Sequence, residues 1–242
     1  MVIINKKNFV KEMLSKIEMQ TLIESLIFTA GFFIMILGIY MNKLNVFLTG
    51  ALAYVMSGYL YESKIMQARI WRAGLYGQQI VEKILSSLDN QFYLINNLSL
   101  PFKNCDIDHL IIGPNGIFLI ETKNYKGEVS CKGDVWEYQK IGKMGGLYKG
   151  YISNPSKQLK RNIWELKTFL DKKSKRTFGE NLFPFWIQGL VVFTNEDTFL
   201  KISDETVVIL RVNDLLKYIQ DFKKERIPVN EITKIVNILK DI

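Results

Sequence analysis

Two long apolar stretches near the start of the chain limit its possible folds more than any other feature. The first runs from Leu22 to Met41 with one early charge, Glu24, and the second runs from Leu44 to Tyr61. A helix of about 20 apolar residues crosses the roughly 30 Å of hydrocarbon in a bilayer. Because only Asn42 and Lys43 separate the two stretches, we expect a transmembrane helical hairpin with a very short turn.

Small residues, which let membrane helices approach closely, recur in both stretches. They are Ala30, Gly31, Gly38, Gly50, Ala51, Ala53, Ser57 and Gly58. A cleaved signal peptide would need small residues after the first stretch, and Ile39-Tyr40-Met41 offers none. A buried hydrophobic hairpin in a soluble protein is the other alternative.

The distribution of charge predicts the orientation of the hairpin. Basic residues flank both of its outer ends: Lys6, Lys7, Lys11, Lys16, Lys64, Arg69 and Arg72. The turn carries only Lys43. Since positive loops stay on the cytoplasmic side, we expect an inner or plasma membrane protein with both termini in the cytoplasm.

Apolar periodicity divides the chain further. Residues 1–20 carry apolar side chains at helical spacing among lysines, which predicts a cytosolic amphipathic segment. The hairpin then occupies residues 21–61, a helical linker residues 62–72, an α/β domain residues 73–212, and C-terminal helices packed on that domain residues 213–242.

Within the α/β domain, strand-like and helix-like patterns alternate. Strands are predicted at 92–100, 107–112, 117–122, 127–131, 187–193 and 207–210, and helices at 74–88, 155–170, 213–222 and 229–239. A glycine-rich basic connection, residues 142–150, precedes the second of these helices.

The few cysteines and the single histidine argue against a disulfide-stabilised fold and a zinc site, and the charge distribution indicates a class of partner. Cys105 and Cys131 lack CxxC spacing, and with the one histidine, His109, they make neither a disulfide framework nor a usual zinc site. The net charge is +8, and residues 140–176 hold eleven Lys or Arg against two acids. Such a cluster favours a polyanion, either nucleic acid or an anionic lipid surface, with a solvated basic face as the alternative.

The stretch from Asp106 to Lys123 is the most informative for chemistry. Gly113-Pro114-Asn115-Gly116 separates two apolar runs, which predicts an antiparallel hairpin. If the turn is symmetric, Asp108 faces Glu121, and Asp106 faces Lys123 on the same side. His109 alternates to the opposite, apolar side, where we expect it to pack in the core.

Three carboxylates gathered in this way repel one another unless a cation neutralises them. Hard oxygen ligands favour Mg²⁺ or Mn²⁺, and a lysine beside a ligating glutamate can hold and polarise a water molecule. These groups equip a site for metal-assisted phosphodiester hydrolysis. The alternative is a surface hairpin with an Asp106–Lys123 salt bridge, but both sides of this hairpin are apolar, which favours a site.

The spacing Asp-x12-Glu-x-Lys resembles the PD-(D/E)XK nuclease superfamily, and the detail resembles its nuclease-related domain family. The matching stretches are Gly74-x-x-Gly77-Gln78, Asp106-Ile-Asp108-His109, Gly113 to Gly127, Trp136, and Asn154-Pro155-x-x-Gln158. The resemblance covers about residues 73–195. It implies an α/β, restriction-endonuclease-like core, a mixed sheet flanked by helices, preceded here by the transmembrane hairpin.

The resemblance also implies roles for individual residues. Asp108 and Glu121 would bind the metal, with the Thr122 carbonyl as a possible third ligand. Lys123 would activate water, and Gln158 would position the water or the scissile phosphate. Asp106 would be an auxiliary ligand or a partner of Lys123.

One position departs from the family pattern. A glutamate commonly follows the second glycine of the first helix, and here Gln78 stands in its place. An amide oxygen can still coordinate weakly, but it brings no charge. The substitution implies weaker metal binding, a different number of ions, or a weakened enzyme.

Several basic residues are candidates for phosphate contacts. They are Lys143, Lys149, Lys157, Lys160 and Arg161. Trp136, Tyr138 and Tyr148 lie among these lysines and could stack on bases, although Trp136 could equally pack in the core.

The sequence therefore supports one main hypothesis and two rivals. The main hypothesis is a membrane-anchored nuclease that cleaves DNA rather than RNA with Mg²⁺ or Mn²⁺, and foreign DNA is one conceivable target. The first rival is an inactivated nuclease fold that binds nucleic acid or a partner protein at the membrane. The second is a membrane-structural protein whose basic patch binds anionic lipid. Homo-oligomerisation and a protein partner stay open.

Overall fold

The computed structural model describes residues 1–101, 105–142, 145–180, 182–224 and 226–240. The chain forms two compact units. One, the hairpin unit, is Phe9–Leu75, and the other, the α/β unit, joins Met1–Asn8 to Tyr76–Ile242.

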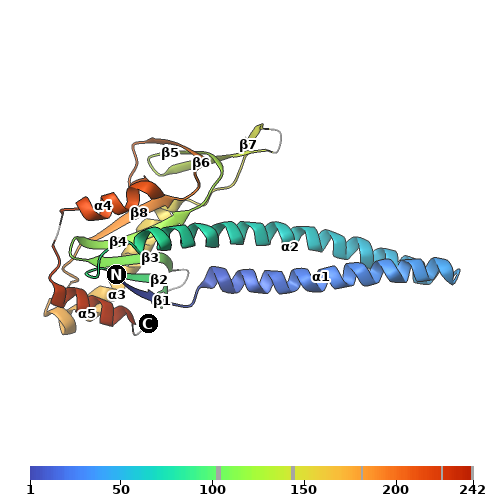
Figure 1. The fold of residues 1–242 in the computed structure, drawn as a ribbon, viewed down its shortest axis with the longest axis horizontal. Helices are drawn as coiled ribbons and strands as arrows, with labels where there is room; N and C mark the ends of the chain where they lie inside the picture. Colours follow the sequence, from blue (N-terminus) through green and yellow to red (C-terminus); the bar gives the residue numbers. More distant parts are fainter. Residues whose placement is uncertain (102–104, 143–144, 181, 225, 241–242) are drawn as a thin grey trace. The chain divides into compact units, whose positions relative to one another are not determined.

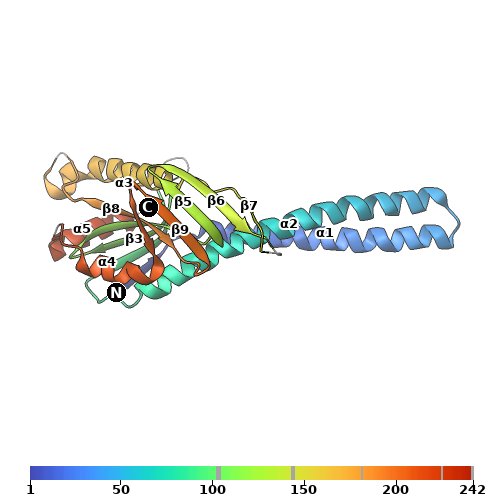
Figure 2. The same cartoon turned by 90° about the horizontal axis from the view of Figure 1, so that it is seen from above.

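The hairpin unit consists of α1 (Phe9–Tyr40) and the larger part of α2 (Leu44–Leu85). The two helices run side by side in opposite directions in both views (Figures 1 and 2). The chain reverses at Asn42, which has a left-handed φ of 52°. An added Cβ at Gly38 would lie 2.3 Å from the Phe47 nitrogen, and one at Gly50 would lie 2.4 Å from the Met35 nitrogen. These glycines therefore allow the close helix contact that the sequence predicted.

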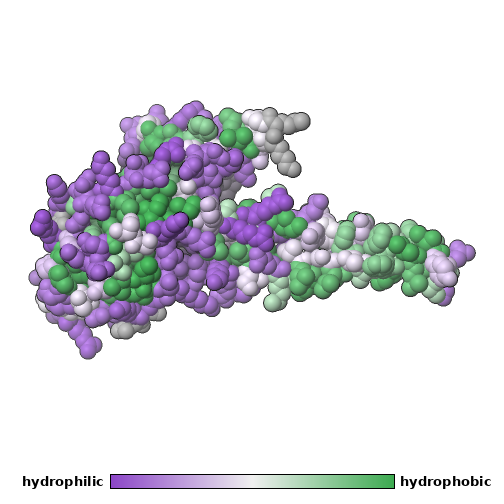
Figure 3. Space-filling view, in the orientation of Figure 1, coloured by the Kyte–Doolittle hydropathy of each residue, from purple (hydrophilic) through white to green (hydrophobic). Residues whose placement is uncertain are grey.

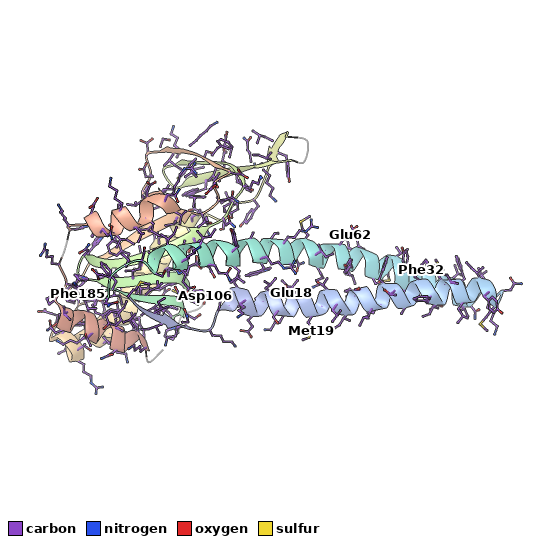
Figure 4. All side chains as sticks on the ribbon, in the orientation of Figure 1. Glu18, Met19, Phe32, Glu62, Asp106 and Phe185 are labelled. Atoms are coloured by element: carbon purple, nitrogen blue, oxygen red, sulfur yellow. The ribbon has the colours of Figure 1, made fainter. Side chains whose placement is uncertain are left out.

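The outer surface of the hairpin is apolar, most strongly toward its turn (Figure 3). Exposed side chains there include Phe33, Ile39, Leu48, Leu52 and Val55. Glu18 and Glu62 lie on the side of Phe32 away from the turn (Figure 4). Both helices are long enough and apolar enough to cross a membrane, and only 11% of each apolar window is buried. That exposure distinguishes them from the core helices of a soluble protein.

The α/β unit contains two sheets. The main sheet has the order β1-β2-β3-β4-β8-β10, and the second sheet has the order β7-β6-β5-β9. The strands are β1 (Val2–Asn5), β2 (Tyr93–Ser99), β3 (Asp106–Gly113), β4 (Gly116–Lys123), β5 (Gly127–Lys132), β6 (Val135–Ile141), β7 (Leu147–Lys149), β8 (Ile187–Phe193), β9 (Thr198–Ser203) and β10 (Val208–Arg211). The main sheet is mixed, because β2, β3 and β4 pair antiparallel while β1, β8 and β10 join in parallel.

Helices cover both faces of the main sheet. Leucine and isoleucine side chains of α3 (Pro155–Phe178) and α5 (Val229–Lys240) form one core with Leu110 and Leu119. The last turns of α2, together with α4 (Leu215–Asp221) after the short η1 (Val212–Asp214), form a second core with Ile111 and Phe118. Figure 2 shows β3 and β8 between α3 and α4. This double cover explains why the central strands are continuously apolar.

The N-terminal residues correct the sequence prediction. We expected one amphipathic helix over residues 1–20, but Val2–Asn5 form β1, paired in parallel with β2, and the helix begins at Phe9. The strand has only four residues and is followed directly by two lysines, so its sequence pattern is too weak to predict a strand. The hairpin is therefore an insertion between β1 and the rest of the α/β unit. Since both of its ends join the same unit, they must lie on the same side of any membrane that it crosses.

The second sheet was only partly expected. The sequence predicted β5 but not β6, β7 or β9. These strands have several exposed side chains, including Val135, Tyr148 and Phe199. Their alternation is mixed with charged residues, so it is weak as a sequence signal.

His109 packs in the core, as predicted. It is 2% exposed, and its Nδ1 lies 2.7 Å from Asn96 Oδ1. Asn96 in turn donates to Asn5 Oδ1 of β1 at 2.8 Å. Burial lowers the pKa of His109 to about 3, so the ring is neutral at physiological pH.

We predict that β1 stabilises the α/β unit through backbone pairing. The N–H groups of Val2 and Lys6 donate to the carbonyls of Phe92, just before β2, and Asn96, within β2. Alternation along the strand therefore directs the Ile4 N–H to β2 and the Ile3 N–H away from it. Ile4→Pro should lower the free energy of unfolding by about 1–3 kcal/mol, since it leaves a carbonyl of β2 without its donor.

Chemical denaturation of the full chain in detergent measures this effect. Ile3→Pro is the matched control and should change stability little, and Ile4→Ala isolates the loss of side-chain packing. Equal effects of the two prolines would contradict the pairing.

Candidate active site

The site lies at the open end of the β3–β4 hairpin. The two strands pair from Gly113↔Gly116 to His109↔Ile120, which is the register that the symmetric turn predicted. The next two residues outward are Asp108 and Glu121. They follow the last position at which β3 and β4 pair with each other, although β3 continues to pair with β2 and β4 with β8.

Both carboxylate oxygens of Asp108 accept hydrogen bonds. The Thr122 N–H donates to Oδ2 at 2.8 Å, and Gln78 Nε2 donates to Oδ1 at 2.7 Å. Burial raises the pKa of Asp108, while the Thr122 hydrogen bond, the charge of Lys123 and the Gln78 hydrogen bond act in the opposite direction.

Glu121 and Lys123 form a buried ion pair. Lys123 Nζ lies 2.6 Å from Glu121 Oε1, and the side chains are only 12% and 3% exposed. Burial raises the pKa of Glu121 to about 7, against the opposing charge of Lys123. Burial by itself lowers the pKa of Lys123, but the charge of Glu121 outweighs it and the pKa is raised. Lys123 Nζ also donates to Gln158 Oε1 at 3.3 Å.

The two glutamines reach the site from helices on opposite faces of the sheet. Gln78 lies in the last part of α2, next to Gly77. An added Cβ at Gly77 would lie 2.9 Å from Asn124 Cβ and 3.0 Å from Thr194 Oγ1. Glycine is therefore needed for α2 to approach the end of β4 closely enough for Gln78 to reach Asp108.

Gln158 is positioned by the start of α3. The Asn154 side chain caps this helix by accepting from the Lys157 N–H at 2.9 Å, and Pro155 occupies the first turn, where its missing N–H costs nothing. Gln158 therefore lies at the end of the first turn. An added Cβ at Gly189 of β8 would lie 2.6 Å from the Ile163 side chain, so a glycine there also lets α3 pack closely on the sheet.

The donor set fits a hard divalent cation. Glu121 Oε2 is buried and has no hydrogen-bond partner within the described part of the chain, which is costly unless something satisfies it. Since a strand residue directs its N–H and C=O to the same neighbour, the Thr122 carbonyl faces β3 on the side of Asp108. Among the described residues, no three His, Cys, Asp or Glu side chains gather as a metal-binding group. The candidate ligands are therefore two carboxylates and a backbone carbonyl.

Asp106 has a different partner from the one considered in the sequence. Its Oδ1 accepts from Ser99 Oγ at 2.5 Å, in register with the Ser99↔Asp106 pair of β2 and β3. Across the residues that the structure describes, Lys123 bonds to Glu121 and Gln158, and Asp106 is not among its partners. The exposed position of Asp106 leaves it beside the site rather than inside it.

The residues predicted to bind phosphate differ in whether their side chains are exposed or already bonded to other residues. Lys149, Lys157 and Arg161 are exposed. Lys160 Nζ is already held by Asp134 Oδ2 at 2.8 Å and by Thr206 Oγ1 at 2.6 Å. Lys143 lies outside the described residues.

The aromatic residues that were candidates for base stacking also differ: some are packed inside the protein and others are exposed. Trp136 Nε1 donates to Ser156 Oγ at 2.9 Å, and its ring stacks on Phe193. Tyr138 is buried and donates to the Lys126 carbonyl at 2.8 Å. Tyr148 is 54% exposed, and it lies with Tyr151, which is 83% exposed, along one groove. Packing therefore accounts for the first two, and the exposed pair is available for stacking.

Two residues near the site were not found from the sequence. Asn162 is fully buried one turn after Gln158 and donates to the Asp106 carbonyl at 3.0 Å, and its helical spacing was a usable signal. Asn8 donates to Gln78 Oε1 at 3.3 Å. It lies 70 residues from Gln78 in the chain, so no local pattern connects them.

Two helix-covered faces, a mixed sheet and a carboxylate–carboxylate–lysine group at a hairpin end define a nuclease-like α/β fold. The family model of the nuclease-related domain matches residues 73–194, which is half of the chain. The chain therefore belongs to the nuclease-related domain family.

One relative is an uncharacterized protein of Bacillus anthracis, which is 38% identical over 61 residues. The match covers 24% of this chain and 28% of the relative, so the chain spans little more than a quarter of that protein. No solved structure matches the chain.

The raised pKa of Glu121 predicts a pH dependence of stability in the absence of metal. Its folded value, about 7, lies above the ordinary 4.5, so the folded protein keeps a proton that the unfolded protein has lost. That contribution to stability is complete below about 4.5 and is lost as the pH rises through about 7. The free energy of unfolding should therefore fall, relative to Glu121→Gln, across this window.

Denaturation in chelator at several pH values measures the difference. Glu128→Gln is the matched control, because Glu128 forms a more exposed ion pair with Lys201 and should show no such change. Parallel curves for the wild type and Glu121→Gln would contradict the raised pKa.

Proposed function

We propose that this protein is a membrane-anchored, metal-dependent nuclease that hydrolyses phosphodiester bonds in DNA. The observation that carries the proposal is the unpartnered, buried Glu121 Oε2 beside Asp108 and the Glu121–Lys123 ion pair. Membership of the nuclease-related domain family supports nuclease activity in general. The metal and the DNA substrate are inferred from the chemistry of the donor groups.

Asp108, Glu121 and the Thr122 carbonyl would hold Mg²⁺ or Mn²⁺. When bound, such an ion stabilises the negative charge that develops on the phosphate and lowers the pKa of the attacking water. Asp108 is kept in place by its two donors, so it is oriented before the cation arrives. Glu121 would hold a cation only in its deprotonated form, and its raised pKa would make the affinity for metal dependent on pH.

Lys123 and Gln158 would position the nucleophile. Lys123 Nζ is fixed between Glu121 Oε1 and Gln158 Oε1. Its remaining N–H group can donate to a water or to a phosphate oxygen. Gln158 directs its carbonyl at Lys123, so its NH₂ group would be the end that donates toward substrate.

The basic residues would hold the nucleic acid backbone. Lys157 and Arg161 are exposed on α3, on either side of Gln158. Contacts with phosphate fix the position of a strand and carry little base specificity. DNA is proposed ahead of RNA by analogy with the nuclease-related domain family.

The hairpin would anchor the nuclease to the inner or plasma membrane. Both helices are of spanning length and composition, and the α/β unit is joined to both ends of the hairpin. Basic residues at these ends and one lysine in the turn favour a cytoplasmic α/β unit. In that location the enzyme would meet DNA entering the cell.

We predict that Glu121→Ala and Lys123→Ala each reduce metal-dependent cleavage by roughly 10²–10⁴-fold, the usual effect of losing a positioned acid–base group. Gel assays of linear, circular and single-stranded DNA, with Mg²⁺, Mn²⁺ or chelator, measure this in detergent-purified full chain. The matched controls are Glu128→Ala and Lys201→Ala, which break a glutamate–lysine pair outside the site.

A second candidate is a nuclease fold that binds nucleic acid or a protein without cutting. It is favoured by the neutral amide of Gln78, which donates to Asp108 where the family commonly has a carboxylate. DNA binding without cleavage by folded protein, in every metal, would select this candidate and exclude the enzyme.

We also predict opposite locations for the turn and the α/β unit. Cys105 and Cys131 are buried, so introduced cysteines can be labelled selectively. A membrane-impermeant maleimide added outside sealed cells should label Lys43→Cys and should label Lys217→Cys only after the membrane is opened. Labelling of both before opening would show that the hairpin does not cross the membrane, and the reverse pattern would invert the orientation.

A further inference from the structure

An aromatic groove lies at the edge of the second sheet. Tyr148 of the edge strand β7 and Tyr151 just after it line this groove together with Trp136 and Tyr138 of β6. The groove has a volume of about 590 Å³, which is within the range of small-molecule sites, about 300–1,000 Å³. Tyr148 is 54% exposed and Tyr151 is 83% exposed. Exposed aromatic side chains gathered in a groove of this size indicate a binding surface.

A series of contacts connects the groove to Lys123. The N–H of Gly150, which stands between the two exposed tyrosines in the sequence, donates to the Tyr138 carbonyl at 2.8 Å. The Tyr138 ring packs on Tyr125, with ring centroids 4.7 Å apart. Tyr125 follows Lys123 by two residues and interacts with its charge. A ligand that extends along these contacts from the groove would therefore reach the candidate site.

The chain that forms the groove also leads into the helix that carries Gln158. Ser153, two residues after Tyr151, forms a hydrogen bond with the Tyr125 side chain. Asn154 then caps α3, and Gln158 lies at the end of its first turn. The groove and the side chain proposed to position the nucleophile are therefore parts of one continuous segment.

The charge of this segment indicates the class of ligand. From Tyr138 to Arg161 the sequence holds six Lys or Arg and no acid. Lys149 in the groove and Lys157 on α3 are exposed. Among the residues that the structure describes, Glu137 is the one acid that lines the groove. An excess of positive charge beside exposed aromatic rings is the combination that binds nucleic acid, because lysines meet phosphates while bases stack on the rings.

Only an unpaired strand can stack its bases on such rings. In a duplex each base is already stacked between its neighbours, whereas the bases of a single strand can turn out onto aromatic side chains. We propose that the groove binds an unpaired nucleic acid strand by stacking on Tyr148 and Tyr151, so that single-stranded segments are the preferred substrate of the candidate site. This inference rests on the proposed function, for which it names the class of substrate.

Binding in chelator tests the proposal without cleavage. Fluorescence anisotropy of the full chain in detergent measures the affinity for a labelled single DNA strand and for the same strand annealed to its complement. Tyr148→Ala and Tyr151→Ala should each weaken single-strand binding roughly fivefold to 100-fold, the usual effect of losing one base–aromatic stack, and leave duplex binding unchanged. Phe199→Ala is the matched control and should change neither, because Phe199 is 62% exposed on β9, at the opposite edge of the same sheet.

Further substitutions separate stacking from apolar volume and from charge. Tyr148→Phe keeps the ring and should bind like the wild type, whereas Tyr148→Leu fills similar space without a ring and should bind like Tyr148→Ala. Neither should change the dependence of affinity on salt. Lys149→Met should reduce the slope of log affinity against log salt by about 0.7, the value for one phosphate contact to a single strand.

The outcomes distinguish the groove from the nuclease. Equal losses for single strand and duplex, losses no greater than that of Phe199→Ala, or full affinity in Tyr148→Leu would overturn the role of the groove, as would absence of single-strand binding by the wild type. If the wild type cleaves DNA and the tyrosine variants bind single strands normally, the nuclease stands without the groove. If the wild type cuts nothing with Mg²⁺ or Mn²⁺ but its single-strand binding depends on both tyrosines, the groove stands without the nuclease.

Discussion

The placement of two carboxylates inside the protein is the constraint on which the rest of the site depends. Asp108 and Glu121 lie where the β3–β4 pairing stops, so the strands themselves supply only the Thr122 N–H. The remaining donors must come from elsewhere, because a buried charge without partners is too costly to keep. Lys123 supplies one, and helices on both faces of the sheet orient the others. The close approach of α2 at Gly77 and of α3 at Gly189 follows from that need.

The insertion of the hairpin into the α/β unit restricts the topology of any membrane crossing. A terminal anchor leaves its far end free, whereas this hairpin has both ends joined to one unit by β1 and by α2. An even number of crossings is then required by connectivity alone. The same arrangement brings an N-terminal residue to the site, since β1 must pair with β2 for the sheet to be complete at that edge. The strand and helix that carry the two ends of the hairpin therefore also carry residues of the candidate site.

Local patterns in the sequence were sufficient to predict the β3–β4 hairpin and the positions of its side chains. The turn at Gly113–Gly116 determines the register, and the register places Asp108 opposite Glu121 and turns His109 into the core. The features that could not be predicted depend on contacts between residues far apart in the sequence. Strand β1 is recognisable only by its pairing with β2, some 90 residues on. Asp106 bonds to Ser99 rather than Lys123 because a third strand, which the hairpin pattern does not include, lies beside it.

The exchange of glutamate for glutamine at position 78 changes what the metal-free site must tolerate. With three carboxylates together, mutual repulsion would hold the site in an unfavourable state until a cation arrived. Here the amide of Gln78 donates to Asp108, so a hydrogen bond stands where a third carboxylate would bring repulsion. For the divalent cation that we propose, the same exchange would remove one negative charge from its surroundings and weaken its binding. In the function proposed above, a site of this kind would depend more on the free concentration of divalent cations than one with a third carboxylate.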